Sequence, residues 1–287
     1  MGPEVVSGGA VLVTGASTGI GEACAMELDR RGYTVFAGVR RDEDGERLKQ
    51  QASASLVPVR LDITDADDIA AAVKTIDAAA GGLGLRAVVN NAGVARGGPL
   101  EYLPLDDWRL QLEVNVIGQV AVTQAVLPLL RKGRGTVVFI GSSNGRVSPP
   151  LMGPYGASKH ALEAIAESLR HELRDAGIRV VLVEPGAVKT PIWDKGRALA
   201  DELEKSLPGE AVERYAGHIK AVRKGIDMQD RAGIPPSAVA AVVLKAIESA
   251  RPRARYLVGR DAVASGIAAR FLPDRVRDLL VAKLAGP

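Results

Sequence analysis

Residues 11–21 read Val-Leu-Val-Thr-Gly-Ala-Ser-Thr-Gly-Ile-Gly, and a stretch with helical periodicity begins at Gly19. The apolar run Ala10–Thr14 predicts a short buried strand. Gly15 permits a tight turn, Gly19 lets the backbone approach a pyrophosphate, and Gly21 lets the helix pack closely on the strand. Free N–H groups and the positive dipole end of the helix would then face the phosphates. Because these glycines follow a strand and open a helix, they predict dinucleotide binding rather than a plain strand-to-helix turn.

Short valine-rich runs alternate with helical patterns over the first two thirds of the chain. The runs predicted as buried strands are Ala10–Thr14, Thr34–Val39, Leu56–Leu61, Ala87–Asn90, Thr136–Ile140 and Arg179–Val183. The helical patterns between them cover Gly19–Arg31, Asp65–Ala80, Leu105–Leu130 and Tyr155–Ala176. Repeated β–α–β units predict an α/β fold with a doubly wound, Rossmann-type parallel sheet. In such a sheet the ligand is expected at the carboxyl ends of the strands.

The last third of the chain has a different pattern. Residues of about 191–234 form short charged helical pieces separated by Gly and Pro, and we predict a helical substrate cap rather than a second domain. Ser237–Ala250 is predicted as a helix and Arg255–Val258 as a last strand. Residues of about 261–287 show the pattern of an amphipathic C-terminal helical tail. We therefore interpret residues 1–287 as a single domain.

Composition narrows the classes of function. The chain is 47% hydrophobic but only 3% aromatic, which suits an aliphatic parallel sheet covered on both faces. The net charge of +3 predicts a weak attraction to anions such as a phosphorylated cofactor. The sequence lacks the dense Lys/Arg stripe of a nucleic-acid-binding groove, so nucleic-acid binding is not expected. Cys24 is the single cysteine, and its apolar helical surroundings predict a buried hydrophobe. A lone cysteine and scattered histidines predict neither an internal disulfide nor a metal site.

Targeting signals are not evident in the sequence. The N-terminus lacks the charged and then apolar pattern of a secretory signal, and no apolar stretch is expected to span a bilayer. The sequence therefore predicts a cytoplasmic protein. The tail would either rest on a membrane surface or pack on its own domain or a partner subunit, and the pattern favours packing. The apolar residues of the tail are Val263, Ile267, Phe271, Val276, Leu279 and Leu280.

Tyr155 and Lys159 are four residues apart at the start of a predicted helix, so their side chains share one helix face. A free tyrosine loses its proton only near pH ~10. A neighbouring lysine ammonium favours the phenolate, so we predict that Lys159 lowers the pKa of Tyr155 toward neutral pH. A tyrosine tuned in this way can act as an acid or base.

The motifs occur in a characteristic order. The spacing Gly-x-x-x-Gly-x-Gly, the run Asn90-Asn91-Ala92-Gly93 and the pair Tyr155-x-x-x-Lys159 resemble the short-chain dehydrogenase/reductase family over about residues 8–195. The phosphate loop, Arg40 and Glu184-Pro185-Gly186 are most similar to its hydroxysteroid and retinol dehydrogenase branch, although many relatives have Asn in place of Glu. The resemblance implies an oxidoreductase that transfers a hydride between a nicotinamide cofactor and a carbonyl or alcohol.

The resemblance also implies a catalytic set. Ser142 lies thirteen residues before Tyr155, the spacing of the family's catalytic serine, whereas Ser143 is off by one. Asn115, in Asn-Val-Ile-Gly, resembles the helix-bending asparagine that holds a water for proton relay to Lys159. In the implied reduction Ser142 and Tyr155 polarise the substrate oxygen, Tyr155 donates its proton, and Lys159 holds the nicotinamide ribose.

Arg40 and Arg41 stand at the end of the second predicted strand, where an NAD-selective fold has an acidic residue. A guanidinium pairs with a 2′-phosphate in bidentate fashion, so we predict NADP(H) rather than NAD(H). Similar family members carry this preference at the position of Arg40, whereas Arg41 is equally consistent with a solvated loop arginine.

The resemblance extends the set of cofactor contacts. Asp62 is expected at the adenine, Asn90 beside the adenosine ribose with a partly structural role, and Val188 and Thr190 at the nicotinamide carboxamide. The predicted cofactor-binding residues are Gly15, Ser17, Thr18, Gly19, Ile20, Gly21, Arg40, Arg41, Asp62, Ile63, Asn90, Ala92, Gly93, Tyr155, Lys159, Pro185, Gly186, Val188 and Thr190.

The substrate is less well defined. Leu151, Met152, Ile192 and Trp193 are predicted to line a largely apolar pocket. A bulky apolar carbonyl or alcohol, such as a steroid, a retinoid or a long-chain compound, is the favoured substrate, and a β-ketoacyl thioester is the alternative. A non-catalytic NADP-sensing protein on the same fold is the alternative of another class. The helices that begin at Leu105 and Tyr155 form subunit interfaces in relatives, which implies a homodimer or homotetramer.

Overall fold

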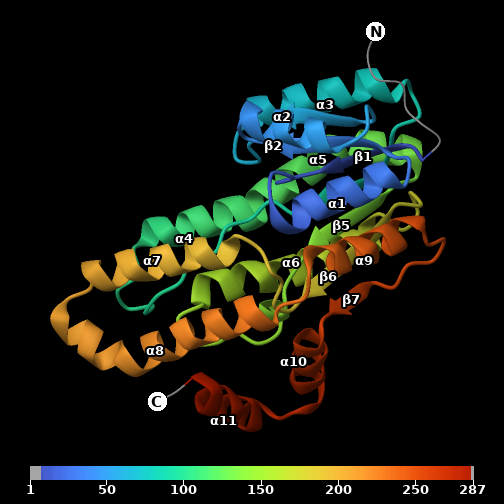
Figure 1. Cartoon of the computed structure of the whole chain (residues 1–287). Coiled ribbons are helices and arrows are strands. Elements are labelled where there is room, and N and C mark those ends of the chain that lie inside the picture. Colours follow the sequence, from blue (N-terminus) through green and yellow to red (C-terminus); the bar gives the residue numbers. More distant parts are fainter. Residues whose placement is uncertain (1–7, 286–287) are drawn as a thin grey trace.

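A computed structural model of the chain describes residues 8–285 and contains one parallel sheet covered by helices (Figure 1). Among these residues, seven strands lie in the order β3-β2-β1-β4-β5-β6-β7. They are β1 (Ala10–Val13), β2 (Thr34–Val39), β3 (Leu56–Arg60), β4 (Leu85–Asn90), β5 (Thr136–Ile140), β6 (Arg179–Pro185) and β7 (Arg255–Val258). The predicted doubly wound α/β fold is confirmed. Residues 1–7 and 286–287 of the predicted domain lie outside the described residues.

Helices connect the strands and form the C-terminal third of the chain. The α-helices are α1 (Gly19–Arg30), α2 (Asp42–Gln51), α3 (Ala66–Ala80), α4 (Leu105–Leu112), α5 (Gln119–Gly133), α6 (Gly153–Glu172), α7 (Ile192–Ser206), α8 (Gly209–Ala232), α9 (Pro236–Glu248), α10 (Arg260–Phe271) and α11 (Asp274–Ala285). A π-helical turn, η1 (Glu113–Gly118), joins α4 to α5, and a 3-10 turn, η2 (Ser143–Gly145), follows β5.

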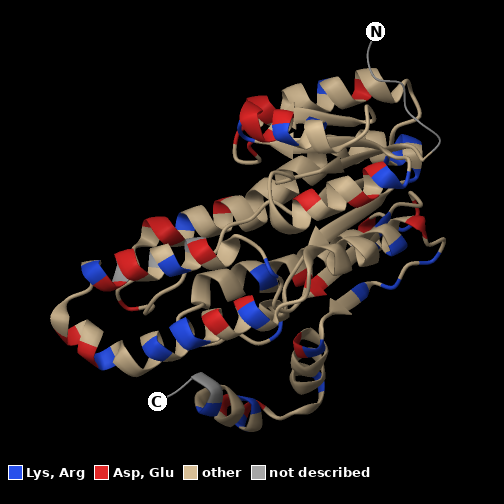
Figure 2. Cartoon of the chain, viewed as in Figure 1, with Lys and Arg blue, Asp and Glu red and all other residues tan. Residues whose placement is uncertain are grey.

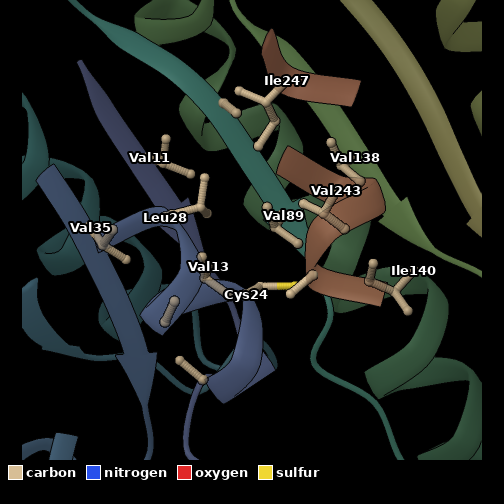
Figure 3. Packing of buried hydrophobic residues seen from close by; sticks show 14 of the residues in the cluster. Val11, Val13, Cys24, Leu28, Val35, Val89, Val138, Ile140, Val243 and Ile247 are labelled. Atoms are coloured by element: carbon tan, nitrogen blue, oxygen red, sulfur yellow. The ribbon is translucent and has the colours of Figure 1, made fainter. Parts of the chain in front are cut away.

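Two hydrophobic cores lie on opposite faces of the sheet. On one face α1 and α9 pack together over the central strands, where Figure 3 shows Leu28, Val89 and Val243 among the buried side chains of one cluster. Cys24 is fully buried in this core, and burial raises the pKa of its thiol to about 12, which confirms the predicted buried hydrophobe. Residues of α3, α5 and α6 form the core on the other face. Burial on both faces is why the strands read as continuous apolar runs.

The strand order places the site. β1 pairs with β2 on one side and with β4 on the other, so the chain crosses over in opposite directions from β1. Ligands of such sheets bind at the carboxyl ends of the strands beside this reversal. The loops after β1, β4, β5 and β6 carry the predicted phosphate loop, the Asn-Asn-Ala-Gly run, Ser142 and the Pro-Gly turn, so all four meet at this edge.

Two helical predictions need correction. The charged helix α2 was not predicted. Leu48 is its one buried large apolar side chain, so the sequence shows no helical periodicity of apolar residues there. The predicted stretch Leu105–Leu130 runs on to Gly133 and contains η1. Over Leu105–Gly133 it is long and apolar enough to cross a membrane, contrary to the sequence expectation, and among the described residues it is the one helix that meets this test. In this fold its residues Val122 and Val126 are buried in the core between α3 and the sheet.

The segment predicted as a substrate cap, residues of about 191–234, consists of two long helices, α7 and α8, instead of the expected short pieces. Glycines within both helices are accommodated, and Pro208 precedes the start of α8. Arg223 of α8 pairs with Asp201 and Glu204 of α7 at 2.5 and 2.6 Å. Figure 2 shows both signs of charge interleaved along these helices. The charged composition that suggested loops therefore serves ion pairs between helices.

Candidate active site

The phosphate loop is built so that only glycine fits at three positions. Gly15 and Gly19 have φ values of +63° and +62°, a left-handed backbone that favours glycine. A Cβ at Gly15 would lie 2.8 Å from the Cα of Ala92, and one at Gly21 would lie 2.2 Å from the carbonyl oxygen of Gly15. A Cβ at Gly19 would lie 3.0 Å from Thr190 Cγ2, so the segment after β6 meets the phosphate loop. This backbone cradle before α1 fits a dinucleotide pyrophosphate.

Polar side chains join the loops after β1 and β4. Thr14 Oγ1 accepts from the backbone N–H groups of Asn91 and Ala92, each at 3.0 Å. In return, Asn91 Nδ2 donates to the carbonyl oxygens of Thr14 and Gly15, each at 3.0 Å. Asn91 thus fixes the start of the phosphate loop, although the prediction singled out its neighbour Asn90. Its position in the Asn-Asn-Ala-Gly run was the signal that could have found it.

Asn90 has a structural role in this arrangement. Its side chain is fully buried and donates to Thr123 Oγ1 of α5 at 2.8 Å. The partly structural role predicted for Asn90 is thus a link between β4 and α5, whereas its contact with the cofactor stays a prediction. Ala92 is partly exposed and Gly93 is exposed, so both are accessible, and their contact with the cofactor stays a prediction.

The loops after β2 and β3 form the predicted adenosine end. Arg40 and Arg41 are both exposed, and Arg41 forks onto Asp44 at 3.0 and 3.2 Å. Asp62 accepts from the backbone N–H and the hydroxyl of Thr64 at 3.0 and 2.7 Å. Burial opposes the ionisation of Asp62, but the Thr64 hydrogen bonds and the charge of Arg40 lower its pKa overall. Arg40 therefore lies in the electrostatic reach of Asp62, and Ile63 beside it is buried.

Arg47 is a residue of this end that sequence reasoning missed. It projects from α2, donates to the carbonyl oxygen of Ser17, and pairs with Glu22 of α1 at 2.6 Å. The phosphate loop is therefore held from outside by a helix that the sequence pattern did not reveal. The signal was weak because one arginine in a charged segment reads as a solvated residue.

Ser142, Tyr155 and Lys159 come together at the end of β5. Ser142 caps η2 by accepting from the Asn144 N–H at 3.2 Å, and it hydrogen-bonds Tyr155. Lys159 is buried, donates to the carbonyl oxygen of Ile140 at 2.8 Å, and has its Nζ 5.7 Å from the centre of the Tyr155 ring. Three of the four predicted catalytic side chains therefore share one place.

The electrostatics of this group differ from the prediction. Burial raises the pKa of Tyr155, and the Ser142 hydrogen bond offsets only part of that effect. Burial also lowers the pKa of Lys159 to about 8, because its ammonium is removed from water. The prediction that Lys159 pulls the pKa of Tyr155 toward neutral pH is therefore wrong for this structure. Tyr155 is protonated at neutral pH, which is the form that an acid needs.

Lys159→Met is expected to alter how stability depends on pH. Between the folded pKa of about 8 and the ordinary value of 10.5, the unfolded chain binds more protons at Lys159 than the folded protein does. Stability rises with pH wherever the unfolded state binds more protons. The free energy of unfolding of wild type should therefore rise by roughly 3 kcal/mol relative to that of the variant as the pH increases across this range. Urea unfolding at several pH values measures this difference. A difference between the two proteins that stays constant with pH would contradict the lowered pKa.

Asn115, the fourth predicted catalytic residue, is fully buried in η1. Its Oδ1 accepts from the Val94 N–H at 2.8 Å, and its Nδ2 donates to the Val94 carbonyl at 2.9 Å and to Ser158 at 3.2 Å. Gln111, which sequence reasoning missed, donates to the same carbonyl at 2.9 Å. These amides clamp the loop after β4 against α6. The π-helical turn agrees with the predicted bend, whereas the water relay stays a prediction.

Hydrogen bonds to backbone carbonyls hold the two segments that carry the predicted substrate-pocket residues. Leu151 has a φ of +63°, and its carbonyl accepts from the Gly98 N–H at 2.7 Å. Trp193 donates from its indole to the Val188 carbonyl at 2.7 Å. A cavity of about 440 Å³ lies beside the Ser142 loop. Its lining contains none of the four predicted pocket residues and comprises Arg146, Val147, Ser148, Pro150, His218, Arg277, Asp278, Val281 and Ala282. The tail therefore contributes a wall that the sequence did not indicate.

Comparison with known proteins agrees with this geometry. The chain matches the short chain dehydrogenase family over residues 9–200. It is 36% identical to an NADPH-dependent 3-dehydrocapnine reductase of Ornithobacterium rhinotracheale, with 95% of each chain covered. It is also 36% identical to retinol dehydrogenase 7 of Rattus norvegicus, covering 94% of this chain and 87% of the relative. A short chain dehydrogenase of Burkholderia cenocepacia, solved with NADP, superposes with a TM-score of 0.72 at 26% identity over 100% of both chains.

The chain belongs to the short chain dehydrogenase family, and it is an oxidoreductase. The resemblance to this family and to its retinol and hydroxysteroid branch, derived from the sequence motifs, is confirmed.

Proposed function

We propose that the protein interconverts a carbonyl and a secondary alcohol with NADP(H), acting on a bulky apolar substrate. The observation that carries this proposal is the convergence of Ser142, Tyr155 and Lys159 at the end of β5, on the sheet edge that also holds the glycine cradle. The similar 3-dehydrocapnine reductase, which is NADPH-dependent, and the similar retinol dehydrogenase support both the cofactor and the apolar substrate.

The chain's own residues supply binding and proton transfer. When bound, NADPH supplies the hydride. The cradle around Gly15, Gly19 and Gly21 would hold its pyrophosphate, with Arg40 at the 2′-phosphate. Tyr155 is protonated at neutral pH because burial raises its pKa, so it donates its proton to the substrate oxygen as the alcohol forms. The Ser142 hydroxyl hydrogen-bonds the same oxygen and orients it toward Tyr155.

The pKa of Tyr155 bears on the direction in which the enzyme works best. Reduction needs the protonated tyrosine, whereas oxidation needs a base at the same atom. Since burial disfavours the phenolate, the isolated electrostatics of Tyr155 favour reduction near neutral pH. Lys159, with a pKa of about 8, changes its charge just above neutral pH and so adds a second titration next to the reacting atoms.

Arg40→Ala is expected to separate the two cofactors. The exposed guanidinium of Arg40 would pair with the 2′-phosphate that only NADPH carries, so its loss should raise the Kd of NADPH at least ~10-fold and leave that of NADH nearly unchanged. Fluorescence titration of both cofactors measures this. Arg41→Ala is the matched control, because Arg41 is exposed and adjacent but already forks onto Asp44. An equal loss of affinity for NADPH and NADH in Arg40→Ala would refute the assignment.

The substrate class is tested with purified protein and a panel of steroid, retinoid, long-chain, β-ketoacyl-thioester and small aromatic carbonyls, following NADPH oxidation by absorbance. Rapid turnover of bulky apolar carbonyls supports the proposal. Faster turnover of a β-ketoacyl thioester would overturn the substrate class. Tight NADPH binding with no turnover on any compound would instead favour the cofactor-sensing role.

We also propose that the protein acts in the cytoplasm as a homodimer or homotetramer. Leu105, Leu110 and Ile117 on the long helix before β5 are exposed apolar side chains, which supports a subunit interface there. The tail packs on its own domain through Asp261, which accepts from the Ala187 N–H at 2.6 Å, while Phe271 and Leu279 remain exposed. These apolar residues would be covered by a second subunit rather than by a membrane surface. Light scattering after gel filtration measures the number of subunits, and repeating the filtration with lipid vesicles measures whether the protein binds a membrane surface.

A further inference from the structure

A fully buried carboxylate lies next to the active site. Glu184 is the residue of β6 just before Pro185 and Gly186, and its side chain is 0% exposed. The guanidinium of Arg146 donates to both of its oxygens, from Nε and, at 3.0 Å, from Nη2. The Arg255 Nε lies 3.7 Å from the same carboxylate. A buried carboxylate keeps its charge only with such pairing, and a fork of this kind fixes direction as well as distance.

A second carboxylate completes the group. Glu163 of α6 lies 2.9 Å from Arg255 and 3.8 Å from Arg146. Two carboxylates and two guanidiniums therefore alternate, and we call Arg146, Glu163, Glu184 and Arg255 the four-charge cluster. Its members come from the end of η2, from α6, from β6 and from β7. The cluster thus joins three consecutive elements, η2, α6 and β6, to β7 near the end of the chain.

The four-charge cluster borders the catalytic residues on two sides. Ser142 caps η2, and Arg146 directly follows this short turn. Glu163 follows Lys159 by one helical turn on α6 and so lies on the same helix face. Between them Gly145 is packed so tightly that a Cβ there would lie 3.0 Å from the Lys159 carbonyl oxygen. The cluster therefore ties the loop that carries Ser142 to the helix that carries Tyr155 and Lys159.

We propose that Arg146 and Glu184 are positioning residues that hold the Ser142 loop on β6 and, through the contact of Arg146 with Glu163, beside α6, so that Ser142 and Tyr155 reach one substrate oxygen. This inference rests on the proposed function of those two side chains. Two groups that share one oxygen must keep their separation, and a misplacement of ~1 Å costs ~100-fold in rate. Neither Arg146 nor Glu184 needs to touch the substrate oxygen to have this effect. The pair also gives a physical reason for Glu where many relatives have Asn.

Arg146→Lys tests the proposal without removing the charge. A lysine ammonium still neutralises Glu184, but as a point charge it cannot make the fork. We expect the NADPH Kd to stay within about threefold of wild type while kcat falls roughly 10- to 100-fold. Hydrogen exchange at the amides of residues 143–147 should become faster. Arg31→Lys is the matched control, because Arg31 pairs with Glu248 at 2.7 Å on the exposed surface, and all three measurements should equal wild type.

A second variant keeps the proposal falsifiable if the lysine variant does not fold. Arg146→Gln combined with Glu184→Gln leaves no unpaired buried charge in this pair, so the protein should fold but keep a low kcat and fast loop exchange. Wild-type kcat and wild-type exchange in the double variant would overturn the positioning role. The exchange measurement needs no turnover. If wild type reduces no carbonyl at all, the proposed function fails, while loop exchange still decides whether Arg146 and Glu184 hold the loop.

Discussion

Tyr155→Phe should bind NADPH with wild-type affinity and lose at least ~100-fold in turnover, the usual scale of general acid–base catalysis. The substitution removes only the hydroxyl that donates the proton, and it keeps the ring that packs near Lys159. Because burial holds the pKa of Tyr155 above its ordinary value, the phenolate form does not contribute near neutral pH. The loss of turnover should therefore be similar from about pH 6 to about pH 8. Steady-state NADPH oxidation over this pH range measures it.

The matched control removes a hydroxyl from another buried tyrosine. Tyr33 is 5% exposed and precedes β2 at the amino ends of the strands, away from the site edge. Tyr33→Phe should keep turnover within about twofold of wild type, since it touches no reacting atom. If Tyr155→Phe also kept near-normal turnover, Tyr155 would not be the proton donor and the proposed mechanism would be wrong.

Gly21→Ala should abolish NADPH binding, with a Kd at least ~100-fold above that of wild type. The new Cβ would lie 2.2 Å from the Gly15 carbonyl oxygen and 2.4 Å from Asn91 Nδ2, so the turn after β1 must move. That turn aims the free N–H groups of α1 at the phosphates, and overpacking should also destabilise the fold by about 1–3 kcal/mol. Fluorescence titration of NADPH and thermal unfolding measure the two effects separately.

Gly225→Ala is the control for this prediction. Gly225 lies inside α8, and a Cβ there meets no atom within 4 Å. Its replacement should leave NADPH affinity unchanged and stabilise the protein by about 0.5–1 kcal/mol through helix propensity. Wild-type NADPH affinity in Gly21→Ala would show that the cradle does not depend on close contact between Gly21 and Gly15.

Several features of the fold and site could be predicted because their signals are local. Strands buried on both faces leave continuous valine-rich runs, so every strand was found with its ends within two residues. Gly15, Gly19 and Gly21 record backbone shapes and close approaches that no other residue tolerates. The four-residue spacing of Tyr155 and Lys159 fixes their common helix face.

Features that depend on contacts between distant residues could not be predicted. Helix α2 carries Arg47 to the phosphate loop, yet a charged segment with one buried leucine gives no periodicity. The tail reaches the Ala187 N–H through Asp261, and no pattern in residues 261–285 announces that contact. The expectation of short pieces between residues 191 and 234 was wrong, because Gly and Pro in the sequence do not reveal the ion pairs that join two long helices, α7 and α8.

The sequence by itself determined the order of the strands along the chain, the glycine cradle and the common helix face of Tyr155 and Lys159, because period and spacing are properties of the chain. Ser142 followed from the resemblance to the family. Only the tertiary structure decided the charges at the site. It buries Tyr155 and Lys159, so that the pKa of the tyrosine rises and that of the lysine falls to about 8, and it encloses Glu184 beside Arg146. The physical reason is that a pKa depends on lost hydration and on neighbours across the fold, and neither is written in local sequence.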